Sequence, residues 1–260
     1  MTVGEARSPI PPAGALLRED RYLWAWSGPG GLAYAVVTDR GEVVARGLCP
    51  GPSPALNVHV LAGEPGEVQI LWLDPASDAL SALAVKAAGE AGAARVLATG
   101  VDYFTAVGDD LLALARDGEV ILLDPSGDQL GRVDLGGGEG RSLDGLVVDD
   151  RPLLAVNRRL GSRYELLYLS WRRTSPYDAQ VVVLESDHLS LSTVLRPARL
   201  GVADGQVYVL LGEESAGGES RGRGAVEYYV FPLSRPDAAE RYPLTINPVS
   251  SGPRASTSAT

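Results

Sequence analysis

Short apolar runs alternate with turns along most of the chain, and they do so in a pattern that recurs. In each copy an apolar run ends in a turn, a strongly β-prone run follows, and a hairpin leads to a further apolar run. Five copies can be recognised: Gly14–Trp26, Asn57–Asp74, Tyr103–Arg116, Gly145–Arg158 and Arg199–Gly212. Equivalent points recur roughly every 40 to 55 residues, a length that suits one four-stranded sheet per unit.

The third copy shows the pattern most clearly. It contains four candidate strands: Tyr103–Val107, Leu111–Ala115, Glu119–Leu123 and Gln129–Asp134. Each pair of strands is separated by a short segment rich in Gly, Asp, Pro or Ser, which is typical of a tight turn. Tight turns between all neighbouring strands predict an antiparallel up-and-down sheet, because parallel strands need long crossovers.

The other copies contain strand signals of the same kind. In the first copy, Leu32–Thr38 and Glu42–Gly47 flank the hairpin turn Asp39-Arg40-Gly41. Later copies contain the candidate strands Gly145–Val148, Leu153–Asn157, Tyr164–Trp171, Gln180–Leu184, Gln206–Leu211 and Val226–Phe231. We expect linkers or loops at Cys49–Pro54, Ser186–Pro197 and Glu213–Gly224.

The Ala-rich segment Asp78–Leu97 allows two interpretations. Leu80, Leu83 and Ala87 have helical spacing. The neighbouring units, however, have a strand–turn–strand at the same place. We therefore predict two strands with Gly89 as the turn.

Equivalent strands also predict the core. The apolar middles of these strands should be buried between neighbouring sheets: Trp24, Trp72, Leu112, Leu153 and Val209. Truncation of Trp72 to Ala is then expected to cost roughly 3–5 kcal/mol of folding free energy. A denaturant titration that gives a loss below about 1 kcal/mol would place Trp72 outside the core.

The fold class that follows is all-β, a β-propeller of about five four-stranded blades or an incomplete ring. We expect a single domain at 13–246, a flexible segment at 1–12 and a disordered Pro/Ser/Thr-rich tail at 247–260. The strand Trp72-Leu73-Asp74, followed by runs such as Leu166-Leu167-Tyr168-Leu169, resembles uncharacterised bacterial propellers of the sialidase-like superfamily in architecture. The chain has no intact Asp box and no Gly-His and Trp-Asp pair, and no kelch-type Gly-Gly doublet recurs at blade spacing, so the resemblance transfers no catalytic residue.

Composition limits the classes of partner. The 260 residues include 23 basic and 33 acidic residues, a net charge of −10, which opposes binding to nucleic acid or to an anionic membrane. Cys49 is the only cysteine, so no intramolecular disulfide and no zinc-type cysteine cluster can form. The amino end lacks a signal-peptide pattern and no run is long enough for a membrane helix. These features predict a cytoplasmic chain, or an extracytoplasmic one if it belongs to a longer protein.

Candidate chemistry is sparse. His59 and His188 are the only histidines and occur in unlike contexts. Asp pairs such as Asp149-Asp150 are placed at hairpin turns, where Asp is favoured for turn hydrogen bonds rather than for metal binding. We therefore expect no metal, no cofactor and no catalytic residue.

Position in the repeat points to one possible binding site. The first strands of successive units should line the channel of the ring and bring polar side chains to one mouth: Asn57, His59, Asp102, Tyr103, Asp144 and Arg199. The set mixes hydrogen-bond acceptors, an aromatic face and one permanent cation, which suits a polar or sugar-like ligand.

Three functions fit these features. The first is a non-enzymatic binding or scaffold domain that uses its loop rim or axial channel to bind a protein or a carbohydrate. The alternative is a sialidase-like glycoside hydrolase, or a carbohydrate-binding domain of a larger bacterial surface protein, which would need convergent carboxylates in one pocket. A sensor domain of a longer surface protein is the third.

Overall fold

The fold was analysed in a computed structural model, which describes residues 12–28, 30–50, 55–63, 66–108, 112–161, 163–172, 175–185, 193–195, 198–215 and 226–244. These residues form β-strands and one short 3-10 turn, η1 (Pro236–Ala238). Within them, no helix has the length and apolar character that a membrane crossing requires. The predicted terminal segments 1–12 and 247–260 lie outside the described residues, except for Pro12.

The strands form five antiparallel sheets, which we number as blades in chain order. The first blade contains β1 (Ala13–Arg18), β2 (Arg21–Gly28), β3 (Gly31–Thr38) and β4 (Val43–Pro50). The second contains β5 (Leu56–Ala62), β6 (Glu67–Asp74), β7 (Ala79–Lys86) and β8 (Arg95–Ala98). The third contains β9 (Tyr103–Ala106), β10 (Leu112–Arg116), β11 (Glu119–Leu123) and β12 (Gln129–Asp134).

The last two blades follow the same plan. The fourth contains β13 (Glu139–Val148), β14 (Arg151–Leu160), β15 (Arg163–Arg172) and β16 (Ser175–Glu185). The fifth contains β18 (Arg199–Ala203), β19 (Gln206–Ser215), β20 (Val226–Pro232) and β21 (Glu240–Leu244). The short strand β17 (Thr193–Leu195) pairs with the far end of β19. Apart from β17, each strand hydrogen-bonds to its sequence neighbours within the same blade, as the tight turns predict.

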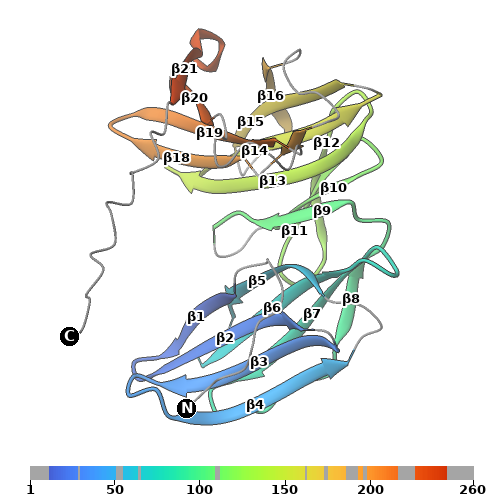
Figure 1. Ribbon diagram of the computed structural model, residues 1–260, viewed down its shortest axis with the longest axis vertical. Helices are drawn as coiled ribbons and strands as arrows, with labels where there is room; N and C mark the ends of the chain where they lie inside the picture. The colour runs from blue at the N-terminus through green and yellow to red at the C-terminus, as the bar shows by residue number, and fades with distance from the viewer. Residues whose placement is uncertain are drawn as a thin grey trace, which may run out of the picture.

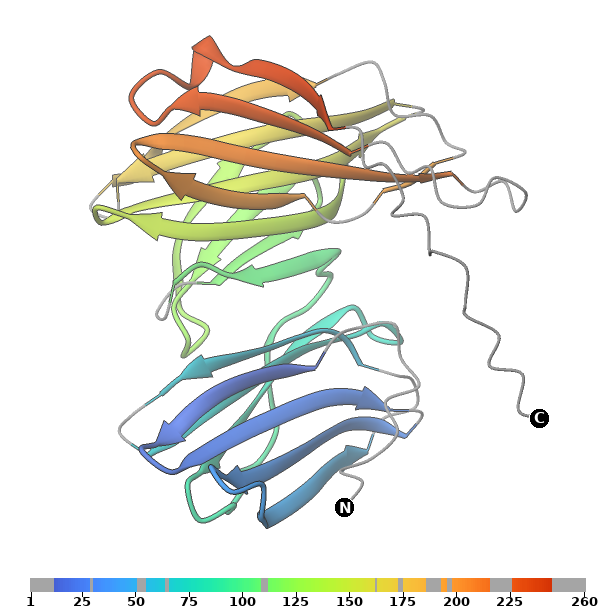
Figure 2. The ribbon, with the colours of Figure 1, turned by 60° about the vertical axis from the view of Figure 1, so that its left-hand side comes forward.

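The first strands of the blades lie innermost and follow one another around an arc. β1 contacts β5, β5 contacts β9, β9 contacts β13, and β13 contacts β18. The first and fifth blades lie at the two ends of this arc (Figures 1 and 2), and no extended contact joins their described strands. The ring of inner strands is therefore open on one side.

The core consists of apolar layers between successive blades. Leu23 of the first blade packs with Ile70 of the second, and Leu71 packs with Phe104 of the third. Ala113 packs with Leu154 of the fourth blade, and Tyr168 packs with Phe231 of the fifth. A blade between two others buries both faces, which explains why its central strands are almost continuously apolar.

The segment predicted as a hairpin at 78–97 is confirmed. β7 is paired with β6 and β8, and Gly89 has a φ of 87° in the turn between β7 and β8. Alternate residues of β7 enter different layers: Leu80 and Ala82 face the third blade, while Leu83 faces the first. Burial on both faces removes the polar alternation that normally identifies a strand, so helical spacing arises here by coincidence.

The core prediction was right for three of its five residues. Leu112, Leu153 and Val209 are fully buried. Trp24 was wrong: the residue is 43% exposed, because it lies on the face of the first blade that no other described blade covers. Trp72 is partly buried at the margin of the layer between the first two blades.

Several predicted boundaries also shift. The segment predicted as a linker at Cys49–Pro54 begins inside β4, and the loop predicted at Glu213–Gly224 begins inside β19. β13 begins at Glu139, well before the predicted start at Gly145. Pairing with a neighbouring strand extends these elements beyond what their own sequence favours: β4 pairs with β3, β13 with β14, and the end of β19 with the short strand β17.

Candidate functional site

Four of the predicted site residues gather near the inner strands. His59 is on β5, Tyr103 on β9, Asp144 on β13 and Arg199 on β18. They come from the second to fifth blades, so each blade in this series contributes one side chain. We call these four residues the axial cluster.

Asp144 and Arg199 join the fourth and fifth blades. Nη1 of Arg199 lies 3.5 Å from Oδ1 of Asp144, and the backbone N–H of Leu200 donates to Oδ2 of Asp144 at 2.7 Å. Burial raises the pKa of the Asp144 carboxyl, although the Leu200 N–H and the Arg199 guanidinium act in the opposite direction. The guanidinium side chain is 66% exposed, so the ion pair leaves much of the Arg199 donor group accessible.

The charges of this ion pair also affect the pKa values of Tyr103 and His59. Burial raises the pKa of Tyr103, whereas Arg199 lowers it and Asp144 raises it by smaller amounts. Burial and, to a smaller extent, Arg199 lower the pKa of His59 to about 4. At neutral pH the cluster therefore presents a protonated phenol and a neutral imidazole, each of which can donate and accept a hydrogen bond.

The rings of the cluster are held by neighbouring residues. The imidazole of His59 packs edge-on against Phe104 with ring centroids 5.2 Å apart. Phe104 is fully buried between the second and third blades. This contact fixes the imidazole next to the third blade and contributes to its desolvation.

The remaining two predicted residues have different surroundings. Asn57 has a φ of 52°, and its Nδ2 donates to the backbone carbonyl oxygen of Phe104 across the gap between β5 and β9. Asp102 is exposed just before β9, and its backbone N–H donates to Ala115 at 2.9 Å. Asn57 thus acts as a link between blades. His188 lies outside the described residues.

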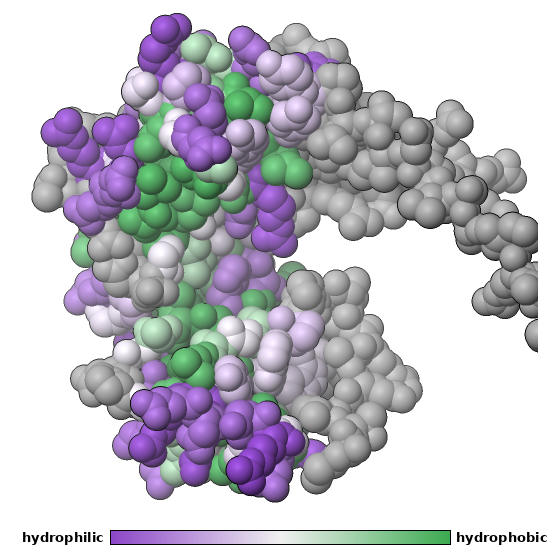
Figure 3. Space-filling model, turned by 90° about the vertical axis from the view of Figure 1, so that its left-hand side faces the viewer, coloured by the Kyte–Doolittle hydropathy of each residue, from purple (hydrophilic) through white to green (hydrophobic). Residues whose placement is uncertain are grey.

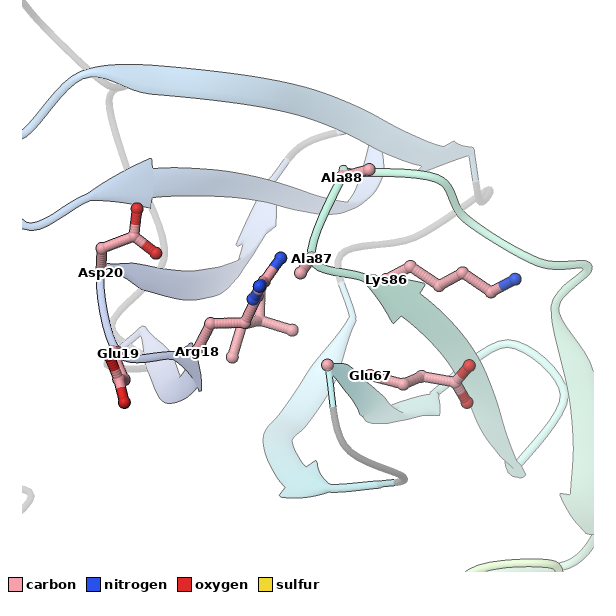
Figure 4. Close-up of a pocket in the computed structure, with 9 residues that line it drawn as sticks. Arg18, Glu19, Asp20, Glu67, Lys86, Ala87 and Ala88 are labelled. Atoms are coloured by element: carbon pink, nitrogen blue, oxygen red, sulfur yellow. The ribbon is translucent and has the colours of Figure 1, made fainter.

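Sequence reasoning missed a hollow at the rim of the first two blades. It has a volume of about 900 Å³ and is lined by Leu17, Arg18, Glu19, Asp20, Gly66, Glu67, Lys86, Ala87 and Ala88. Figure 4 shows Arg18 directed toward Ala87, with Lys86 and Glu67 side by side. Figure 3 shows hydrophilic side chains gathered over the lower part of the molecule, where these two blades lie.

One feature of the sequence could have pointed to this hollow. Lys86 is the only lysine of the chain, and it is opposite Glu67 in the register of β6 and β7. Hairpin ends of different blades meet here, however, and the sequence does not indicate which ends are neighbours. The charges of the lining are mixed, so the hollow does not select a ligand of one sign.

The described residues offer no group of three or more His, Cys, Asp or Glu side chains that could hold a metal ion. The axial cluster itself contributes one carboxylate and one imidazole. It is therefore a hydrogen-bonding site that contains one ion pair.

Five four-stranded antiparallel blades around an arc of inner strands define a β-propeller. No family model matches the chain, and no curated protein matches it by sequence. The fold is similar to that of Kuenenia stuttgartiensis hydrazine synthase, with a TM-score of 0.59 and 7% identity over 96% of this chain and 70% of that chain. At this identity the similarity shows the fold alone.

Two further solved structures are more distant. The Vanderwaltozyma polyspora Nup133 β-propeller domain has a TM-score of 0.49 and 9% identity over 91% of this chain and 75% of that chain. Cellvibrio cellulosa alpha-L-arabinanase complexed with arabinohexaose has a TM-score of 0.45 and 11% identity over 90% of this chain and 94% of that chain.

Proposed function

We propose that this propeller is a non-enzymatic binding domain whose axial cluster binds a polar, sugar-like ligand. The observation that carries the proposal is the convergence of His59, Tyr103, Asp144 and Arg199 from four successive blades. Together they offer a guanidinium, a carboxylate, a phenol and a neutral imidazole. Such a mixed set of donors and acceptors matches the hydroxyl groups of a carbohydrate better than it matches a lipid.

The protonation states favour binding over turnover. A nucleophile needs an adjacent base or a lowered pKa, but burial raises the pKa of Tyr103. The carboxylate of Asp144 is occupied by the Leu200 N–H and by Arg199. A glycoside hydrolase needs two carboxyl groups across one bond, and the axial cluster supplies one.

Glycoside hydrolysis remains the second candidate because of one observation. Burial raises the pKa of Asp144, the direction expected of a general acid. If the domain hydrolyses glycosides, Asp144→Asn will abolish release of an aryl leaving group and leave binding largely intact. If it only binds, no aryl glycoside will be cleaved by the wild type.

The test of binding is a titration calorimetry series with neutral and acidic oligosaccharides. Arg199→Gln and Tyr103→Phe are expected to weaken binding about tenfold each, the loss of one or two hydrogen bonds. Arg132→Gln is the matched control, because Arg132 is 64% exposed with Glu119 at 3.6 Å, compared with 66% and 3.5 Å for Arg199. Equal affinity of all four proteins, or no binding by the wild type, would contradict the proposal.

A further inference from the structure

The two ends of the open arc each present a blade face that no other blade covers. Every layer of the core lies between successive blades, so the second, third and fourth blades have both faces covered. Among the described blades, the first packs only against the second, and the fifth only against the fourth. Each end blade therefore presents one face that the other described blades leave open.

The uncovered face of the first blade is apolar and aromatic. Strand register places five side chains on it, and we call them the first end face: Leu16, Tyr22, Trp24, Trp26 and Leu48. Leu16 is 57% exposed and Leu48 is 60% exposed. The indole of Trp24 lies over Gly14, whose missing Cβ would come within 2.8 Å of the ring, so the indole lies against the sheet with 43% of the side chain exposed.

The uncovered face of the fifth blade has a similar character. Register places four side chains on it, which we call the fifth end face: Tyr208, Leu210, Tyr228 and Tyr242. Tyr228 and Tyr242 stack with ring centroids 5.3 Å apart. Leu210 is 38% exposed and Tyr242 is 40% exposed. Exposed Trp and Tyr side chains gathered on one face are typical of interaction surfaces.

The two faces are the opposite halves of one repeating interface. Each core layer joins one face of a blade to the other face of the next blade. The fifth end face is therefore the side that would receive another blade, and the first end face is the side that would dock onto one. Each face also carries one charge of opposite sign: Arg46 on the first end face, and on the fifth Glu240, whose carboxylate accepts a hydrogen bond from the Tyr242 hydroxyl.

We propose that a second copy of this chain occupies these faces, with the fifth end face of one copy packed against the first end face of the next. The open arc holds the two faces of one copy apart, so only another copy can bring them together. Such a head-to-tail contact uses different faces on the two partners, and it extends into short open chains unless the rotation closes a ring.

The area of the two end faces determines how strongly two copies are expected to associate. The first blade has 30 strand residues (6, 8, 8 and 8) and the fifth has 27 (5, 10, 7 and 5, β17 left out). With spacings of about 4.8 Å between strands and about 3.3 Å between residues, each face covers roughly 430–480 Å². The total is near the lower limit of about 1,000 Å² for specific interfaces. The association should therefore be reversible and depend on protein concentration.

The test is sedimentation velocity across about a hundredfold range of concentration. The mean mass of the wild type is expected to rise with concentration. Trp24→Glu removes the first end face and Leu210→Glu removes the fifth, so each variant alone stays monomeric. Because each variant keeps one intact face, an equal mixture forms a heterodimer and nothing larger.

Controls keep the test decisive. Leu130→Glu on β12 changes a side chain that is 47% exposed away from both faces, and it should associate like the wild type. Leu48→Glu repeats the first-face test on β4, the outermost strand of its blade. Circular dichroism of each variant verifies folding. A wild type that is monomeric throughout, single-face variants that still associate, or a mixture of folded variants without heterodimer would each overturn the proposal.

Discussion

Asn57 shows how one residue can connect two blades. Its backbone has a φ of 52°, which Asn tolerates better than most residues, and its Nδ2 donates to the Phe104 carbonyl oxygen. β5 has an irregular register with β6 between Leu56 and His59, so Asn57 is released from the ladder to make this contact. The position predicted as a ligand group thus has a structural role in the described residues.

We expect Asn57→Ala to destabilise the domain by about 2 kcal/mol. About half of this loss comes from backbone strain and about half from the lost hydrogen bond. Asn57→Gly keeps the backbone conformation and loses only the hydrogen bond, so it should cost about 1 kcal/mol. Urea titration of the three proteins measures both values. Equal losses for Ala and Gly would show that the backbone contributes little.

His59 should make the domain sensitive to acid. Its folded-state pKa of about 4 lies below the ordinary value of 6.5, so the unfolded chain binds the proton more readily. The free energy of unfolding is unaffected by this group above about pH 6.5, and it falls as the pH drops toward 4, by about 3 kcal/mol in total. His59→Gln should remove this component from the pH dependence of the unfolding free energy.

A nuclear magnetic resonance titration of His59 tests the electrostatics of the cluster directly. Because Arg199 contributes to the lowered pKa, Arg199→Gln should move the titration to higher pH, while Arg132→Gln should leave it unchanged. An unchanged His59 pKa in Arg199→Gln would mean that the guanidinium is not close to the imidazole.

At the scale of elements, hairpins were predictable wherever turn residues were explicit. Glu119–Leu123 and Gln129–Asp134 have the predicted bounds because Asp117-Gly118 and Pro125-Ser126-Gly127 terminate the strands on both sides. β7 and β8 were predictable only by analogy with neighbouring units. The extra strand β17 was not predicted, since three residues paired to the end of another strand leave no periodic signal.

The turn between β7 and β8 also docks onto the first blade. A Cβ added to Gly89, which has a φ of 87°, would lie 2.0 Å from Cβ of Ala45 on β4. We expect Gly89→Ala to cost more than about 2 kcal/mol, from the left-handed conformation and from the displacement of β4. Gly41→Ala is the control, because Gly41 has a φ of 78° with nothing within 4 Å, and it should cost about 1 kcal/mol. Equal melting temperatures of the two variants would contradict this interpretation.

At the scale of the whole molecule, blade number was predictable and curvature was not. The repeat gives the number of sheets, because each needs its own set of apolar runs and turns. The opening between the first and fifth blades depends on small rotations between successive blades, which no single residue encodes. Trp24 illustrates the consequence: its apolar strand position predicts burial, but its exposure is decided by the absence of a neighbour beyond the first blade.

The same curvature explains how much of the candidate site could be predicted. Alignment of the inner strands placed Asn57, Asp102 and Asp144 at equivalent positions with Arg199 near them, and His59 and Tyr103 were added because they lie on the same strands. In the structure Asp144 and Arg199 form an ion pair, and Arg199 influences the pKa of both His59 and Tyr103. Asn57 and Asp102 occupy equivalent sequence positions but differ in their contacts. A bulge or a strand end changes the direction in which a side chain points, and an alignment of repeats does not show this change.

The open arc has a consequence for the order in which the molecule loses structure. Because the extended contacts of each described blade are with its neighbours and none joins the two described ends, the molecule behaves as a one-dimensional array. Its stability is then a sum of the stabilities of the blades and of the interfaces between them. In native-state hydrogen exchange, amides of β3 in the first blade should therefore exchange sooner than those of the central strand β10 in the third. Fraying would proceed inward from the ends, and equal protection of β3 and β10 would mean that the blades unfold as a single cooperative unit.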